Sequence, residues 1–573
     1  MQLSVRRFPP ILLLLTSLLI LSSPGLVEKV HAQYFSFGKN KVHYEDQDWS
    51  YLQSRHFTVY YPDGSVYLAD FAARAAEESF GPMARLFRLN PERRIVLIIY
   101  PNHAEFAVTN AVNLPTFSDA IGGVTELYKN RIAIPFAGDY RDFRRVVHHE
   151  LVHAVVNEVY YGGSVQSLLQ LGQKMRIPNW FNEGLAEYLA LGWDTQSDMY
   201  VREAILEDQL PEIKQLSGYM AYRGGQSVWD YIAEHYGDEK VVEILQKLKT
   251  SRSVEQAILR STGLTIDELS DDWKRTLREV YFPEVTARES LEKIGRPIIT
   301  ENEGFYNTSP ALSPFGDRIA FVTTTSGLFD IYIADANDGT IQTRLIQGQV
   351  SREFESLKIL SPGLSWSPDG NTLAAAVRSG PSDAVILIDV LTEQTTRIDV
   401  PGIKHILSLS WAPDGERIAL GASNGSQSDI WLLSVDSGGL ENLTNDVFGD
   451  FEPVWSPDGS VIVFHSDRGA QTELGRFTTA TTRIFDTTFD QEDLYSIRLG
   501  SRFSRRLTSN ETWDDRSARF GLDNNRVVFI SDRNGIDNLY EKHLVTGQVR
   551  PLTDLDVGVM QVSVAAGSDL AAM

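Results

Sequence analysis

The chain has 573 residues, of which 76 are acidic and 53 are basic, and it contains no cysteine. A disulfide scaffold, a thiolate metal site and a cysteine nucleophile are therefore excluded, and a hydrophobic content of 42% excludes global disorder. The formal net charge of -23 argues against nucleic acid as a partner, because binding to a phosphate backbone depends on Lys and Arg.

The first 32 residues have the pattern of a signal peptide. A basic pair at 6–7 precedes an apolar run over 11–21, and Val-His-Ala at 30–32 fits the positions that a signal peptidase reads. The alternative is a retained membrane anchor, but polar residues interrupt the run, which is shorter than the roughly 20 apolar residues that a span needs. We expect cleavage after Ala32, export to the periplasm or cell envelope, and no transmembrane segment in the mature chain.

Residues 33–285 mix strand-like and helix-like patterns, which predicts an α+β domain. The stretches 56–61 and 94–100 are apolar or alternate like strands, whereas 66–87 spaces its apolar residues along one face of a helix. A later run, 266–281, is predicted to be the closing helix of this half. We place a linker at 286–304 and a second domain at 305–573.

A helical segment over 144–160 carries the sequence His-Glu-Leu-Val-His at 149–153. Positions four apart share one face of a helix, so His149 and His153 can reach one zinc ion while Glu150 lies beside the open coordination position. Because a chance match to this motif is expected on the order of once per hundred proteins of this size, a third ligand has to be found.

The third ligand is predicted within 178–188, Pro-Asn-Trp-Phe-Asn-Glu-Gly-Leu-Ala-Glu-Tyr. A catalytic zinc commonly takes three protein ligands, and a carboxylate from a second helix often completes a pair of histidines, a role that Glu183 fits. Glu187, one turn later, is expected to accept the ring N–H of a ligand histidine. The alternative is an ordinary amphipathic helix with solvated carboxylates, which requires the two motifs to coincide by chance.

Together these segments resemble the gluzincin metallopeptidases of the peptidase MA-like group, over about residues 35–285. The likeness includes Gly-Gly-Val-Thr-Glu at 122–126, which leads into a second strand-like stretch. The resemblance implies that His149, His153 and Glu183 bind zinc (Zn2+). It also implies that the upstream strand is the sheet edge along which a peptide substrate pairs.

The mechanism expected of such a site is hydrolysis of a peptide bond by zinc-bound water. Zinc lowers the pKa of that water and polarises the scissile carbonyl, while Glu150 takes the proton and passes it to the leaving amine. Gluzincins often use a tyrosine for the oxyanion, and Tyr222 is the preferred candidate here, with Tyr219 second. Both could instead pack at a helix start, and Arg223 could contact a substrate carboxylate or only a neighbouring acid.

Beyond about residue 300 the helical spacing ends and a turn sequence with Pro and Gly recurs. The turns lie at 313–317, 367–370, 412–415 and 456–459, and their prolines are 44 to 54 residues apart, a period typical of propeller blades. Proline fixes the first corner of each turn, Asp-Gly closes it, and a strand-like stretch follows. A degenerate fifth copy runs over 517–540, and 562–573 matches only the opening of a repeat. We therefore expect an all-β propeller with five clear blades plus an incomplete sixth.

These repeats resemble the Tol-type periplasmic propellers (WD40-like repeats), six-bladed proteins with the same Ser-Pro-Asp-Gly turn and a terminal Leu-Thr, here at 443–444, 507–508 and 552–553. Residues 296–300 could supply an outer strand to the sixth blade; otherwise the ring is open or the sequence is a piece of a longer one. The insertion 470–491 in the fourth blade is predicted to be a solvated surface loop.

Three functions stay open at this point. We favour an exported zinc endopeptidase or aminopeptidase whose propeller binds the protein or peptide substrate, or a protein partner in the cell envelope. The second is a cell-envelope scaffold with little turnover, which is disfavoured because Glu150 is intact. The third is a zinc hydrolase acting on a non-peptide envelope component, which the sequence does not separate from a peptidase.

Overall fold

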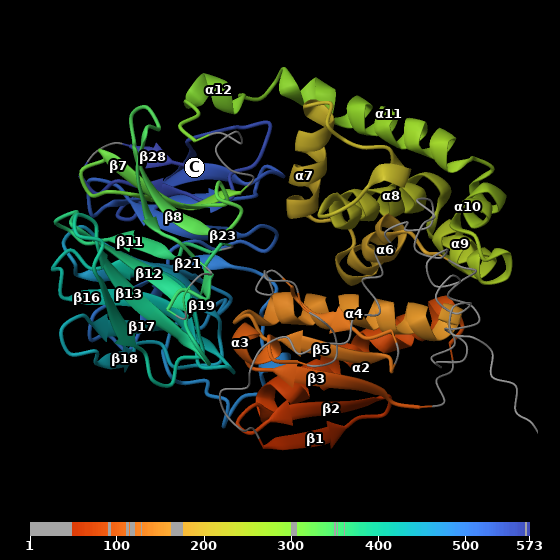
Figure 1. Ribbon diagram of the computed structural model, residues 1–573, viewed down its shortest axis with the longest axis horizontal. Helices are drawn as coiled ribbons and strands as arrows, with labels where there is room; N and C mark the ends of the chain where they lie inside the picture. The colour runs from red at the N-terminus through yellow and green to blue at the C-terminus, as the bar shows by residue number, and fades with distance from the viewer. Residues whose placement is uncertain are drawn as a thin grey trace, which may run out of the picture.

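A computed structural model describes residues 48–89, 93–109, 114, 121–127, 129–161, 176–299, 306–348, 351, 353–359, 361–567 and 570–573. The chain folds into an α+β domain followed by an all-β propeller (Figure 1), so the predicted multidomain architecture is confirmed. The predicted signal peptide, 1–32, lies outside the described residues. Within them, no helix is both long enough and apolar enough to cross a bilayer.

The α+β domain begins with a five-stranded sheet in the order β1-β2-β3-β5-β4. Its strands are β1 (Trp49–Gln53), β2 (Phe57–Pro62), β3 (Ile95–Tyr100), β4 (Val124–Thr125) and β5 (Arg131–Pro135). The three central strands are parallel, whereas β1 and β4 are antiparallel to their neighbours. β4 therefore ends the sheet, and the unpaired backbone groups of such an edge can bind a further strand.

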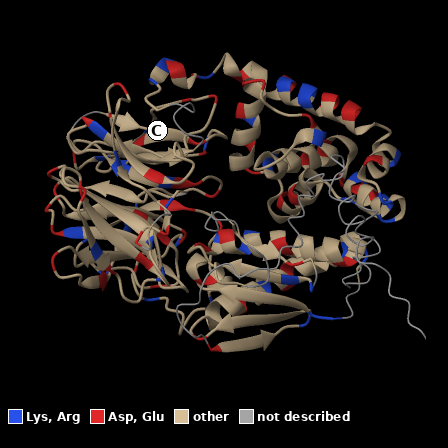
Figure 2. Cartoon of the chain, in the orientation of Figure 1, with Lys and Arg blue, Asp and Glu red and all other residues tan. Residues whose placement is uncertain are grey.

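Helices cover this sheet and build a second lobe above it (Figure 1). They are α2 (Val66–Phe87), α3 (His103–Phe106), α4 (Tyr140–Tyr161), α6 (Asn179–Leu191), α7 (Thr195–Leu206), the 3-10 helix η2 (Ile213–Gln215), α8 (Met220–Tyr236), α9 (Asp238–Ser251), α10 (Val254–Thr262), α11 (Ile266–Val285) and α12 (Leu291–Ile294). α2 has the bounds that its apolar spacing predicts. α11 begins where predicted, at a capping box between Thr265 and Glu268. It lies at the outer rim and carries both acidic and basic residues (Figure 2).

The described residues beyond 305 form five sheets of the propeller type and one two-stranded sheet. The blades are β6 (Asn307–Leu312), β7 (Arg318–Thr323), β8 (Asp330–Asp335) and β9 (Ile341–Ile346); β10 (Ser356–Leu357), β11 (Leu364–Trp366), β12 (Thr372–Arg378), β13 (Asp383–Asp389) and β14 (Thr395–Asp399); β15 (His405–Trp411), β16 (Arg417–Ser423), β17 (Ser428–Ser434) and β18 (Leu440–Asn442); β19 (Asp450–Trp455), β20 (Val461–Ser466), β21 (Asp493–Arg498) and β22 (Ser504–Arg506); and β23 (Asp515–Phe520), β24 (Arg526–Ser531), β25 (Asn538–His543) and β26 (Val549–Pro551). The small sheet pairs β27 (Ser563–Val564) with β28 (Ala571–Ala572). The five predicted blades are thus confirmed, and the two-stranded sheet lies within 562–573, the stretch predicted to open a sixth repeat.

The recurring turn works as its residue types predict. In the second blade Ser367 Oγ donates to Asp369 Oδ1 at 2.6 Å and accepts from the backbone N of Thr372 at 3.0 Å, and Gly370 has a φ of 69°. By contrast, the prediction that residues 296–300 supply an outer strand is wrong for the residues of this stretch that the structure describes. Residues 296–299 form no strand, and the carbonyl of Ile298 instead packs against Gly339 of the first blade.

The fourth blade contains a buried ion group at the end where β19 begins and β20 ends. Arg468 is fully buried and bonds to Asp446 at 3.2 Å and to Asp450 at 2.5 Å, and both of these carboxylates are also fully buried. Because the two carboxylates face one guanidinium, removing Arg468 would leave both of them without this positive charge.

The insertion 470–491 joins the propeller to the α+β domain. The ring of Phe71 on α2 lies 5.4 Å from that of Phe485, which belongs to the 3-10 helix η4 (Ile484–Asp486), and 5.3 Å from that of Phe489. Ile484 and Phe489 are buried in the same hydrophobic core as Phe71. The prediction of a solvated loop is therefore wrong, because apolar side chains of this segment pack on a helix far away in the sequence.

Candidate metal centre

The His-Glu-Leu-Val-His sequence lies in the middle of α4, between the sheet and α6. The helix starts at Asp139, whose Oδ1 accepts hydrogen bonds from the backbone N of Arg141 at 2.7 Å and of Asp142 at 3.3 Å, as helix N-caps do. Val147, Leu151 and other apolar residues of α4 are buried in the core of the domain. The polar residues of the motif are thus carried on a helix that packing holds in place.

Three side chains from two helices converge at one point. His153 Nε2 lies 3.1 Å from His149 Nε2 and 3.0 Å from Glu183 Oε2, and His149 Nε2 lies 3.5 Å from the same Glu183 oxygen. Ligand atoms about 2.0–2.1 Å from a tetrahedral zinc ion are about 3.3–3.4 Å from one another. The three atoms therefore have the spacing of one ligand set, and within the described residues no other group of three His, Asp or Glu side chains is this close.

Glu187 lies behind this cluster with only 5% of its side chain exposed, and its Oε1 is 3.1 Å from His149 Nδ1. Arg145 Nη1 is 3.3 Å from both carboxylate oxygens, and Arg223 Nη1 is 3.3 Å from Oε2. Burial raises the pKa of Glu187, but His149 and the two guanidinium groups lower it to about 2 overall. Glu187 is thus a charged carboxylate placed where it can orient the His149 ring.

The carboxylates of Glu183 and Glu187 favour a positive charge on the imidazole of His149. Burial lowers the pKa of His149, but hydrogen bonds to Glu183 and Glu187 raise it, to about 10 overall. For Glu183, burial raises the pKa, whereas His153 and His149 lower it well below its ordinary value. The two imidazoles and Glu183 could hold a metal cation, because a cation would supply the positive charge that these carboxylates favour.

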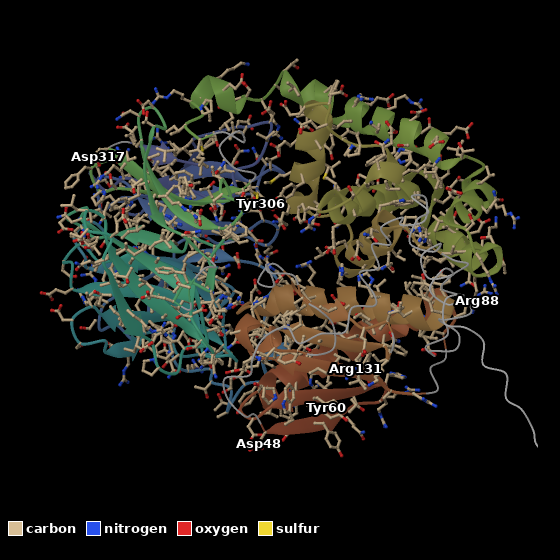
Figure 3. The ribbon with its side chains drawn as sticks, in the orientation of Figure 1. Asp48, Tyr60, Arg88, Arg131, Tyr306 and Asp317 are labelled. Atoms are coloured by element: carbon tan, nitrogen blue, oxygen red, sulfur yellow. The ribbon has the colours of Figure 1, made fainter. Side chains whose placement is uncertain are left out.

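The side chain of Glu150, on α4, faces the edge strand β4. Its Oε2 accepts a hydrogen bond from Thr125 Oγ1 at 2.6 Å, and the same hydroxyl is 3.0 Å from the Glu150 carbonyl oxygen. At Gly123 a Cβ would lie 2.8 Å from Glu150 Cγ, so the strand approaches the carboxylate more closely than a larger residue allows. Arg131, labelled in Figure 3, lies on the neighbouring strand β5. An extended chain added at this edge would pass beside Glu150.

The structure brings one of the two candidate tyrosines to the cluster. The ring of Tyr222 stacks on that of His149, with centroids 6.1 Å apart and an interplanar angle of 14°. Tyr219 is 45% exposed, and its hydroxyl accepts from Arg223 Nε at 2.9 Å. Arg223 itself contacts a neighbouring acid, Glu187, which is one of the two alternatives that the sequence left open.

Close backbone packing of α6 on α8 places Glu183. A Cβ at Gly184 would lie 2.2 Å from the carbonyl carbon of Gly225, and a Cβ at Gly225 would lie 2.3 Å from the carbonyl oxygen of Trp180. The indole of Trp229 also donates to the carbonyl of Phe181 at 3.1 Å.

Sequence reasoning missed two polar residues of the site, Arg145 and Thr125. Arg145 lies four residues before His149 on α4 and therefore on the same face, and this spacing could have found it. Thr125 stands within the strand-like stretch that precedes the motif helix, but no spacing rule links a strand residue to Glu150.

Comparisons with known proteins agree with this two-part structure. Residues 75–279 match the model of the Peptidase MA superfamily, and residues 354–492 match that of the TolB beta propeller domain. The first domain is thus similar to the Peptidase MA superfamily, and the second is similar to TolB propellers. The Peptidase MA match includes the converging histidines and Glu183.

The curated relatives cover only part of the chain. The Tol-Pal system protein TolB of Bordetella pertussis and that of Bordetella parapertussis are each 40% identical over 163 residues, which is 28% of this chain and 34% of the relative. This chain thus spans about a third of the length of the curated relatives it matches.

Solved structures show weaker likeness. TolB from Acinetobacter baumannii has 19% identity and a TM-score of 0.34, over 52% of this chain and 62% of that one. Putative TolB from Agrobacterium tumefaciens has 18% identity and a TM-score of 0.35, over 49% and 93%. The tricorn protease has 16% identity and a TM-score of 0.33, over 45% and 24%.

Proposed function

We propose that the chain is an exported zinc metallopeptidase of the gluzincin type, in which His149, His153 and Glu183 hold the metal. The observation that carries this proposal is the convergence of one atom from each side chain, 3.0 to 3.5 Å apart, from two helices. The match to the Peptidase MA superfamily supports it, because it covers both helices.

The proposed chemistry divides among residues of α4, α8 and β4. A zinc ion held by His149, His153 and Glu183 would supply a Lewis acid for the scissile carbonyl and would make water acidic enough to lose a proton near neutral pH. Glu150 is the general base, which takes that proton and gives it to the leaving amine. Thr125 orients the Glu150 carboxylate, and Tyr222 donates to the developing oxyanion. β4 pairs with the extended substrate backbone beside Glu150.

Export and binding partners follow from the rest of the chain. In this proposal residues 1–32 direct export to the periplasm or cell envelope, 33–285 form the peptidase domain, 286–304 link it, and the propeller at 305–573 binds the protein substrate or an envelope partner. The propeller match to TolB also favours a second candidate, a cell-envelope scaffold with little turnover.

The test compares zinc content and hydrolysis of casein or a peptide library by the mature chain, its Glu150→Gln variant and a Glu158→Gln control two turns along α4. We expect about one zinc per chain in all three proteins and loss of hydrolysis in Glu150→Gln alone, because that variant keeps the ligands and loses the base. If all three bind zinc and none cleaves, the scaffold or a non-peptide substrate replaces the peptidase. If none binds zinc, the assignment of the three ligands is wrong.

A further inference from the structure

The start of α4, the helix that carries His149 and His153, contacts the propeller. Ser428 Oγ of the third blade donates to the carbonyl oxygen of Gly138 at 2.6 Å, directly before α4. Arg141, in the first turn of α4, pairs with Asp514 at 2.6 Å and lies 3.6 Å from Glu492. The third, fourth and fifth blades therefore fix the N-terminal end of α4.

α7, which follows the helix that carries Glu183 and Glu187, also contacts the propeller. α7 begins at Thr195, soon after the end of α6, and Thr195 Oγ1 donates to Asp532 Oδ2 at 3.0 Å. One turn later Met199 packs against Gly558, where a Cβ would lie 1.9 Å from Met199 Cε. The start of α7 is thus held by the fifth blade and by the segment that follows it.

These two contacts meet at one end of the fifth blade. Asp514 lies directly before β23 and Asp532 directly after β24, and the backbone N of Asp514 donates to Asp532 Oδ1 at 2.8 Å. Asp532 therefore uses one carboxylate oxygen for the neighbouring loop of its own blade and the other for α7. A single pair of loops ties the start of α4 to the start of α7.

Hydrogen bonds lead from these contacts to a proposed zinc ligand. Ser197, in the first turn of α7, accepts from Arg223 Nη1 at 3.0 Å, and the same nitrogen is 3.3 Å from Glu187. Glu187 in turn faces His149 Nδ1 at 3.1 Å. On α4, the arginine that pairs with Asp514 lies one helical turn before Arg145, which also bonds to Glu187.

We propose that the fifth blade is a positioning element of the metal centre. Asp514 fixes the start of α4, which carries His149 and His153, and Asp532 fixes the start of α7, which follows the Glu183 helix α6 in the chain. Together the two contacts set the spacing of the ligand atoms. This inference rests on the proposed zinc function. It gives the propeller a role in the chemistry besides binding, because ligand groups must be held within about half an ångström to form a productive site.

The test measures zinc affinity of the full chain, by competition with a chromophoric chelator, and the visible absorption of its Co2+ form. The first variant is Asp514→Ala with Asp532→Ala. The matched control is Asp523→Ala, in the turn at the opposite end of the same blade, where Asp523 faces Arg526 at 3.7 Å. We expect the double variant to bind zinc about 10-fold more weakly and its Co2+ spectrum to change, whereas the control keeps both properties of the wild type.

A second variant removes the same contacts from the peptidase side and leaves the fifth blade intact. It combines Arg141→Ala with Thr195→Val. A matched variant that carries Thr195→Ser in place of Thr195→Val keeps a hydroxyl at this position and should recover part of the zinc affinity. The proposal is overturned if both double variants bind zinc as tightly as wild type with an unchanged Co2+ spectrum, even where their thermal stability falls. If the wild-type chain itself binds no zinc, the proposed function fails and this inference fails with it. Should the first variant not fold, the second decides.

Discussion

The contact between α6 and α8 allows a quantitative prediction for Gly184→Ala. The new Cβ would lie 2.2 Å from the carbonyl carbon of Gly225, whereas ordinary contact begins at 3.4 Å, so the helices have to separate by more than 1 Å. Overpacking against backbone costs about 3 kcal/mol, and the gain in helix propensity returns about 1 kcal/mol, which leaves a net loss of about 2 kcal/mol. For a domain of this size that lowers the unfolding midpoint by roughly 4–8 °C.

The assay is thermal unfolding followed by the helical circular dichroism signal, together with zinc affinity. Because Glu183 is the residue before Gly184, separation of the helices should also weaken zinc binding, by about 10-fold. The control is Gly81→Ala in α2, where the new Cβ would have 3.7 Å to Arg85 Nη1. Because Pro82 follows and disfavours helical backbone at a preceding residue with a Cβ, the gain in helix propensity is offset, so stability should change by less than about 1 kcal/mol and zinc affinity should stay that of the wild type. A Gly184→Ala protein with wild-type midpoint and zinc affinity would refute the packing argument.

Three further predictions address charged groups. Glu187→Gln removes the negative charge that faces two arginines and replaces the charged partner of His149 by a neutral amide. Zinc affinity measured by chelator competition should therefore fall about 10- to 100-fold, and an unchanged affinity would contradict the orienting role. Arg468→Met leaves two fully buried carboxylates unpaired, so urea unfolding of the propeller should show a loss of about 3–5 kcal/mol; a loss below about 1 kcal/mol would show that the ion group is dispensable. Burial raises the pKa of Asp139 to about 6, despite the charge of a neighbouring arginine, so its contribution to the free energy of unfolding is present below about pH 4 and is lost as the pH rises to about 6. Asp139→Asn keeps the helix cap and should flatten this part of the stability–pH curve measured by urea unfolding; an identical curve for both proteins would count against the raised pKa.

Features that depend on local spacing could be predicted from the sequence. The bounds of α2, the recurring turns and the strands that follow them depend on residues a few positions apart, where periodicity and turn chemistry are informative. The pair His149 and His153 belongs to the same class, because a helix brings positions four apart onto one face. Glu183 could be proposed because known zinc sites limit what can complete such a pair.

Features that depend on contacts between distant segments could not be predicted. The insertion 470–491 has no strong periodicity, and the partner that buries Phe489 is Phe71 in the other domain. The pairing of Arg141 with Asp514 likewise leaves no pattern in either segment. A charged residue beside a turn or a helix start has the same local signature whether it faces solvent or another domain.

The shared core of the two domains has a consequence for how this protein is made. Phe71 is synthesised long before Phe485 and Phe489 of the fourth blade, which cover it in the finished molecule. A nascent or truncated chain that ends near residue 285 therefore exposes an apolar surface, and exposed apolar surface promotes aggregation during folding. The end of α11 separates two sequence patterns. The ribosome nevertheless has to synthesise part of the propeller before Phe71 of the first domain can be fully buried.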